Sequence, residues 1–127
     1  MEHLQKEVSR AEACRHLAQF CFDYPDGADP HEVTVAASRC WMLDTPHGRI
    51  LYCVEMFEGC LWVTAAAGVT SAPAVGYLAR ALNRQAAGQD AKEICFYTAR
   101  RGLVRVARRY GYTVTRAMPN GWELKKA

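Results

Sequence analysis

The sequence lacks long apolar runs. No stretch approaches the ~18–20 consecutive apolar residues that a membrane-spanning helix requires. Residues 1–7 also lack the cationic start and the apolar core of a secretory signal peptide. We therefore expect a cytoplasmic protein with no membrane partner.

Metal-ligand motifs are missing as well. The six cysteines include no Cys-x-x-Cys pair, and the four histidines are scattered along the chain. No group of side chains therefore has the spacing of a zinc site, and the sequence predicts no metal. Because a reducing compartment keeps thiols free, we expect all six cysteines to be reduced.

Acidic residues are scarce at the C-terminal end. Residues 100–127 hold eight Lys and Arg but only Glu123 as an acid, a net charge of +7, whereas residues 1–99 carry −4. Such a basic segment suits contact with a nucleotide phosphate, a nucleic acid or an acidic protein. A solvated helix face explains it equally well, and both interpretations stay open. The candidate partner-binding residues are Arg100, Arg101, Arg105, Arg108 and Arg109.

Hydrophobic residues, in contrast, are plentiful. They make up 50% of the 127 residues, and charged residues make up 23%. This balance predicts one globular domain over residues 1–127 with a buried core, and it excludes two independent catalytic domains.

The first half of the chain changes from a helical to a strand-like pattern. Ser9 and Glu12 form a capping box that predicts a helix, and the turn-rich segment 23–30 separates this helix from the rest. Three β-rich runs joined by short turns predict an antiparallel meander over residues 40–43, 49–57 and 60–66. In its middle strand we expect one face to carry Arg49, Leu51, Cys53, Glu55 and Phe57, and the other Ile50, Tyr52, Val54 and Met56.

The second half alternates helices and strands. Ser71 is a predicted cap of a helix that ends at Gly88, and residues 94–97 predict a short buried strand. Residues 112–116 and 121–124 predict a C-terminal hairpin. Between the strand and the hairpin we expect a second helix whose buried stripe is Leu103, Val106, Ala107 and Tyr110.

Three segments are similar to a known family. Residues 63–71 join a strand to a helix, residues 94–100 form the next strand, and residues 106–112 end a helix with a Gly-aromatic step. With the order of elements, they resemble the GCN5-related N-acetyltransferase (GNAT) superfamily over residues 39–127, in a small, bacteriophage-type and motif-degenerate form. The resemblance implies an α+β fold with a central, mostly antiparallel sheet flanked by helices and a shortened N-terminal helical part.

The resemblance also implies a site for acetyl-CoA or another acyl-CoA. In the family, the turn between the last meander strand and the next helix holds the pyrophosphate. The corresponding residues here are Ala66, Gly68, Val69, Thr70 and Ser71. Ala65 stands where the family usually has Arg or Gln, and Thr70 stands where it has a second small residue. Strand 94–97 is expected to splay from strand 60–66, and Gly68 is expected to allow the close approach of a phosphate.

Catalysis would need a base for the acceptor amine. Glu55, in the middle of a strand beside Cys53 and Phe57, is the candidate. Ala107 stands where the family commonly has a tyrosine that acts as general acid.

Three functions follow as hypotheses. The first is an acyl-CoA-dependent N-acyltransferase. The second is a catalytically degenerate GNAT-like protein that binds a protein partner, including a phage structural or host-directed protein located in the host cytoplasm or the virion. The third is nucleic-acid binding through the basic helix, which predicts affinity that falls steeply with salt.

Overall fold

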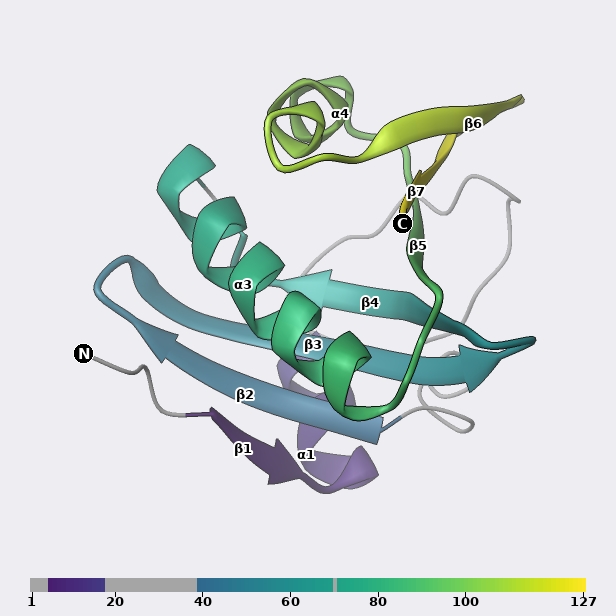
Figure 1. Ribbon diagram of the computed structural model, residues 1–127. Helices are drawn as coiled ribbons and strands as arrows, with labels where there is room; N and C mark the ends of the chain where they lie inside the picture. The colour runs from purple at the N-terminus through teal and green to yellow at the C-terminus, as the bar shows by residue number, and fades with distance from the viewer. Residues whose placement is uncertain (1–4, 18–38, 70) are drawn as a thin grey trace.

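The computed structural model describes residues 5–17, 39–69 and 71–127 (Figure 1). The expected turn-rich segment 23–30, the helix positions from residue 18 onward, and Thr70 lie outside the described residues. The elements are β1 (Gln5–Val8), α1 (Arg10–Leu17), β2 (Arg39–Thr45), β3 (Gly48–Phe57), β4 (Cys60–Ala67), α3 (Ala72–Gly88), β5 (Glu93–Thr98), α4 (Arg101–Arg108), β6 (Thr113–Met118) and β7 (Gly121–Lys126).

Within the described residues, the strands form one seven-stranded sheet in the order β1-β2-β3-β4-β5-β7-β6. Every neighbouring pair is antiparallel except β4 and β5, which are parallel. The expected α+β class with a meander, a helix, a strand, a helix and a terminal hairpin is confirmed. β1 was not expected, because its sequence Gln-Lys-Glu-Val has no apolar alternation.

Helices cover both faces of the sheet (Figure 1). α3 and α4 pack on one face over a core that includes Ile50, Tyr52 and Val54, and α1 lies on the other face over Leu51 and Cys53. The expected alternation in β3 is therefore confirmed in its buried part. The end of β3 is different, because Met56 and Phe57 are 42% and 58% exposed.

The helix starts follow from their caps. The Glu12 N–H donates to Ser9 Oγ over 3.1 Å, and the Ala74 N–H donates to Ser71 Oγ over 3.3 Å. Pro73 stands in the first turn of α3, where a missing N–H is harmless. Both predicted caps are confirmed.

α4 presents a different face from the expected one. The side chains that pack against the core are Val104, Ala107 and Tyr110, whereas Leu103 and Val106 are half-buried outside that core cluster. The predicted stripe is thus wrong at two of four positions. The helix is only eight residues long, so a small rotation about its axis exchanges neighbouring positions at the interface.

Among the described residues, no helix combines the length and the apolar character that crossing a membrane requires. Of the described cysteines, Cys60 and Cys95 form no disulfide. The side chains of Cys14 and Cys21 lie outside the described part of the chain, so the reduced state of all six cysteines stays a prediction.

Candidate functional site

β4 and β5 part in the middle of the sheet. Their pairing runs from Cys60↔Glu93 to Val63↔Phe96, yet β4 continues to Ala67 and β5 to Thr98. The expected separation of these two strands is confirmed.

A β-bulge accompanies the separation. The register between β3 and β4 shifts between Cys53 and Val54, which leaves Thr64 as the extra residue of β4. The Thr64 hydroxyl donates to the Cys53 carbonyl over 3.1 Å and so holds the bulge to β3. Because a bulge bends its strand, β4 turns away from β5 where their pairing stops.

Gly68 directly follows β4 in a left-handed conformation, with φ +91°. A β-carbon there would lie 2.3 Å from the Arg49 carbonyl oxygen of β3. We expected glycine for the close approach of a phosphate, but contact with the backbone of β3 already requires it. A substitution at Gly68 therefore disturbs the turn itself.

The turn leads into the N-terminus of α3. Val69 is buried and Ser71 caps the helix, while Ala66 packs against the α3 side of the core. The N–H groups of Ser71 and Ala72 have no acceptor within the helix, because they precede its first helical hydrogen bond. The turn therefore presents backbone donors at the positive end of a helix dipole.

Arg100 reaches this turn from the other side of the separation. It stands between β5 and α4, and its Nη1 donates to the Val69 carbonyl oxygen over 3.2 Å. This contact uses a carbonyl, so it takes up none of the N–H groups of the turn. The sequence placed Arg100 only among the partner-binding arginines, because a contact across 31 residues leaves no local signal.

Glu55 lies beside the point where the strands part. It pairs with Trp62 in β4, one position from the Val54↔Val63 pair, and it is half-buried on the face away from α3. The structure therefore leaves this carboxylate within reach of a molecule that enters from that face.

A polar and aromatic group on the same face was missed by the sequence analysis. The rings of Trp62 and Tyr97 lie 5.2 Å apart, and Lys125 Nζ lies 5.8 Å from the Trp62 ring. Glu123 is only 9% exposed and accepts a hydrogen bond from the Thr115 hydroxyl over 2.8 Å. Burial, and then the Glu123 carboxylate, raise the pKa of Tyr97. Glu123 had one signal in the sequence, as the lone acid of the basic segment.

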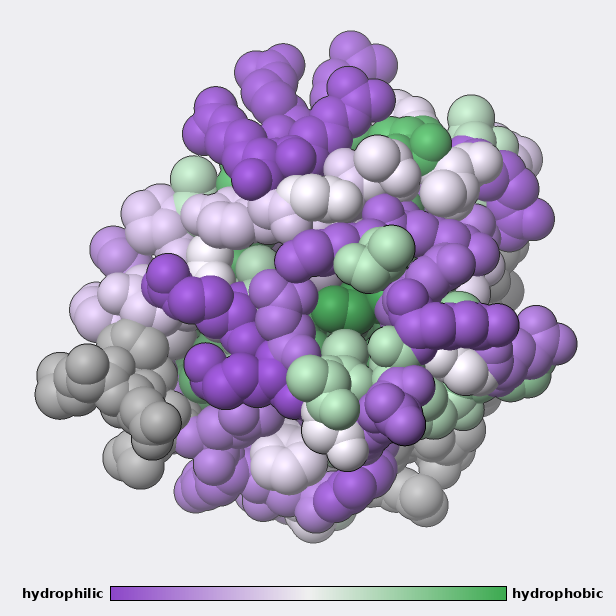
Figure 2. All heavy atoms as spheres, in the orientation of Figure 1, coloured by the Kyte–Doolittle hydropathy of each residue, from purple (hydrophilic) through white to green (hydrophobic). Residues whose placement is uncertain are grey.

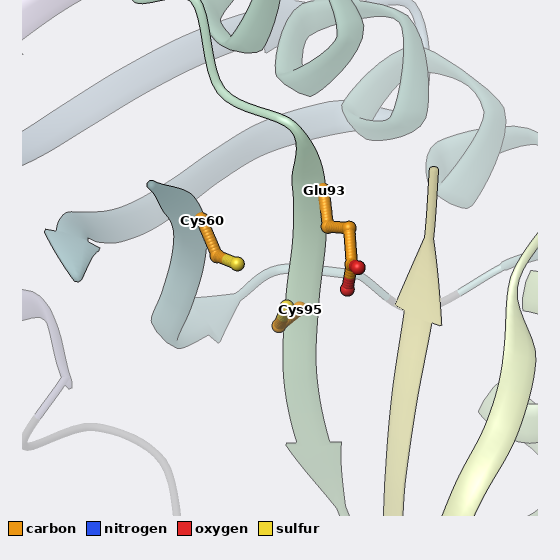
Figure 3. Close-up of side chains that lie close together, drawn as sticks. All are labelled: Cys60, Glu93 and Cys95. Atoms are coloured by element: carbon orange, nitrogen blue, oxygen red, sulfur yellow. The ribbon is translucent and has the colours of Figure 1, made fainter. Parts of the chain in front are cut away.

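Two cysteines and a glutamate meet where β4 and β5 are still paired. The ligand atoms of Cys60, Glu93 and Cys95 all lie within 4.8 Å of one another (Figure 3). Burial, and then the neighbouring Cys60 thiol, raise the pKa of Cys95 to about 12. Since the thiolate is the reactive form, Cys95 is a poor nucleophile.

The other four candidate partner-binding arginines point to solvent. Arg101, Arg105, Arg108 and Arg109 are exposed, and Figure 2 shows a hydrophilic cluster over α4. Arg101 also lies 6.0 Å from the Trp122 ring. The five arginines therefore divide into Arg100, at the turn, and four on the open surface.

β4 and β5 are parallel within a mostly antiparallel sheet, and α3 connects them. The fold is that of GNAT acetyltransferases. A Bacillus subtilis acetyltransferase in complex with CoA is similar at a TM-score of 0.73 and 8% identity, covering 98% of both chains. The ribosomal-protein-S18-alanine N-acetyltransferase from Escherichia coli is similar at a TM-score of 0.71 and 5% identity, over 98% of this chain and 93% of that chain. An aminoglycoside 6'-acetyltransferase type Ii is similar at a TM-score of 0.65 and 11% identity, over 98% of this chain and 96% of that chain.

The sequence itself carries no such match. No protein-family profile matches it, and no curated protein does. At 5–11% identity, the likeness to these solved structures establishes the fold alone.

Proposed function

We propose that this chain is an acyl-CoA-dependent N-acyltransferase. The observation that carries the proposal is the parting of β4 and β5 after Val63 and Phe96, directly before the turn into α3. The pantetheine arm of the coenzyme would run between the separated strands. One of the similar structures holds CoA, which supports the same ligand class here.

The turn from β4 to α3 is the proposed phosphate site. Its residues are Ala66, Gly68, Val69, Thr70 and Ser71, and it offers backbone N–H groups rather than a side-chain cation. Arg100 adds the missing positive charge, because its guanidinium already lies against Val69 and has further N–H groups to donate. This supports binding of a pyrophosphate in spite of Ala65.

Transfer joins the acceptor nitrogen to the acyl carbon and breaks the bond from that carbon to the coenzyme sulfur. The amine loses a proton, and Glu55 is the proposed base because it lies next to the separation point. Ala107 is buried in the core and has no proton to give, so no general acid is assigned at that position. The coenzyme sulfur would leave as a thiolate and take up a proton from solvent.

Calorimetric titration with acetyl-CoA tests the proposal. We expect saturable binding with one coenzyme per chain. Arg100→Ala should weaken it by roughly 10- to 150-fold, because a hydrogen bond to a charged group contributes about 1.5–3 kcal/mol. The exposed Arg105→Ala, on the same basic segment, is the matched control and should bind like the wild type. Absence of saturable binding by the wild-type chain would overturn the proposal.

The second candidate function is a non-catalytic interaction protein with an acidic protein as partner. It rests on the exposed arginines of α4 and its C-terminal turn, which form no ion pair within the part of the chain that the structure describes. The residues concerned are Arg101, Arg105, Arg108 and Arg109. Failure of acetyl-CoA to bind would favour this candidate over the enzyme.

Nucleic-acid binding is the third candidate, and the same arginines would carry it. If the chain binds nucleic acid, its affinity for a random-sequence oligonucleotide should fall steeply as the salt concentration is raised. Replacing Arg105 and Arg108 should lower that affinity further. Protein binding to an acidic partner would depend on salt less steeply, since it releases fewer condensed counterions.

A further inference from the structure

Cys60, Glu93 and Cys95 are fixed next to one another by the parallel register. Cys60 pairs with Glu93, and Trp62 pairs with Cys95. Side chains two residues apart in a strand point to the same face, so all three ligand-bearing side chains project from one face of two hydrogen-bonded strands (Figure 3). Their ligand atoms lie within 4.8 Å of one another before any metal is added.

Two thiols and a carboxylate are the donor set of a soft divalent cation. Zn²⁺ binds thiolate sulfur at about 2.3 Å and carboxylate oxygen at about 2.0–2.2 Å, which places tetrahedral ligand atoms about 3.8 Å apart or slightly less. Closing the group from its present spacing therefore takes side-chain shifts of roughly 1 Å or less.

The surroundings enclose the sulfur side and leave the carboxylate side accessible. Cys95 is fully buried and Cys60 is 9% exposed, whereas the Glu93 side chain is 36% exposed. Lys125 Nζ lies 3.9 Å from Glu93 and also 3.9 Å from Glu123. It can therefore keep a carboxylate partner when Glu93 turns to a cation.

We propose that Cys60, Glu93 and Cys95 bind one soft divalent cation, with Zn²⁺ the best match. Binding forms two metal–sulfur bonds and one metal–oxygen bond, and it releases the two thiol protons to solvent. Three protein ligands leave a fourth position for water. Spacing along the chain indicates no metal site, because these ligands come together only through the pairing of β4 with β5.

The proposed site lies away from the proposed phosphate turn, although Cys95 and Glu55 both pair with Trp62. Cys60 begins β4, and the turn to α3 follows the end of that strand, roughly 23 Å away along it. A cation here joins β4 to β5 within their paired stretch, which ends at the Val63↔Phe96 pair. Its effect should therefore be on stability rather than on the coenzyme site.

Cobalt titration tests the proposal on the full chain, after treatment with reductant and chelator. We expect Co²⁺ to give a thiolate-to-cobalt charge-transfer band that saturates at one ion per chain, and Zn²⁺ to abolish the band by displacement. Losing a residue that only hydrogen-bonds a metal ligand weakens metal affinity by roughly 10- to 100-fold. Cys60→Ser and Cys95→Ser each remove a ligand itself, so each should weaken Co²⁺ binding at least that much. Glu93→Gln should weaken binding while the band persists at saturation.

Cys53→Ser is the matched control, because Cys53 is equally buried but belongs to the core on the α1 side. It should bind Co²⁺ like the wild type. Zn²⁺ should also raise the Tm of the wild type and of Cys53→Ser, but not that of Cys60→Ser. If Cys95→Ser fails to fold, Glu93→Gln still decides the question, since its side chain is partly exposed.

Three results would overturn the proposal. One is a wild-type chain without a saturable band. Another is an equal loss of binding in Cys53→Ser and Cys60→Ser, which would assign the metal to other cysteines. The third is a Cys60–Cys95 disulfide in the freshly isolated protein, found by peptide mass spectrometry.

Discussion

Glu55 and Glu58 are close in sequence but differ in their surroundings. Glu55 is half-buried in β3 opposite Trp62, whereas Glu58 is exposed in the turn to β4 with φ +53°. Only Glu55 is next to the place where β4 and β5 part. A base must reach the proton that it removes, so position separates these two carboxylates as candidates.

Replacing the proposed base gives the residue-scale prediction. Glu55→Gln should lower kcat by roughly 10²–10⁴-fold, because proton transfer by a placed base contributes about that much. Binding of acetyl-CoA by calorimetry should not change. Thiol release from acetyl-CoA, with a primary-amine peptide as acceptor, measures the rate, and Glu58→Gln is the control. An unchanged rate in Glu55→Gln would remove it as the base.

The structural roles of single residues could be predicted only in part from the sequence. Ser9 and Ser71 were identified as caps, since capping depends on neighbours three residues away. The reason for Gly68 was not visible, because the atom that excludes a β-carbon belongs to Arg49 on another strand. Arg100 was named for its charge, but its place beside Val69 depends on the packing of the whole domain.

At the scale of elements, α4 shows that the buried face of a short helix is hard to predict from the spacing of its apolar residues. The sequence predicted Leu103 and Val106 as buried, but Val104 packs against the core in their place. Eight residues give little more than two turns, so two apolar stripes fit the pattern almost equally well. The longer α3 left no such ambiguity, and its expected residues Leu78 and Leu82 are buried.

Two truncations distinguish these stripes. Val104→Ala should reduce the free energy of unfolding by about 1–2 kcal/mol, because it leaves a gap against the core. Leu103→Ala, which removes a larger but half-buried side chain outside the core cluster, should cost less than about 1 kcal/mol. Urea denaturation followed by circular dichroism measures both. The reverse order would restore the stripe that the sequence suggested.

At the scale of the whole molecule, Tyr52 connects parts of the chain that lie far apart in sequence. It is fully buried in β3, its hydroxyl donates to Gln85 Oε1 of α3 over 3.2 Å, and it accepts from the Gln5 side chain of β1. The order of elements was predictable, because each follows from local periodicity. These contacts were not, because they depend on the sheet order, and β1 itself was not expected.

This buried tyrosine predicts how stability changes at high pH. Burial raises the pKa of Tyr52 well above its usual value of 10, and burial does the same for Tyr112. Above pH ~10 the unfolded chain loses these protons while the folded chain keeps them. Stability is therefore fully present below pH ~10 and falls as pH rises, by up to about 1.4 kcal/mol per pH unit for each tyrosine.

Tyr52→Phe isolates the contribution of one group. It removes a hydroxyl that contacts β1 and α3, so at pH 7 it should lower the free energy of unfolding by about 1 kcal/mol. Above pH ~10 the free energy of unfolding of this variant should fall less steeply with pH than that of the wild type, and the difference in slope is the contribution of Tyr52. Urea denaturation at a series of pH values measures both slopes. Parallel slopes would mean that Tyr52 titrates alike in the folded and unfolded chains, and that its hydroxyl is open to water rather than held between β1 and α3.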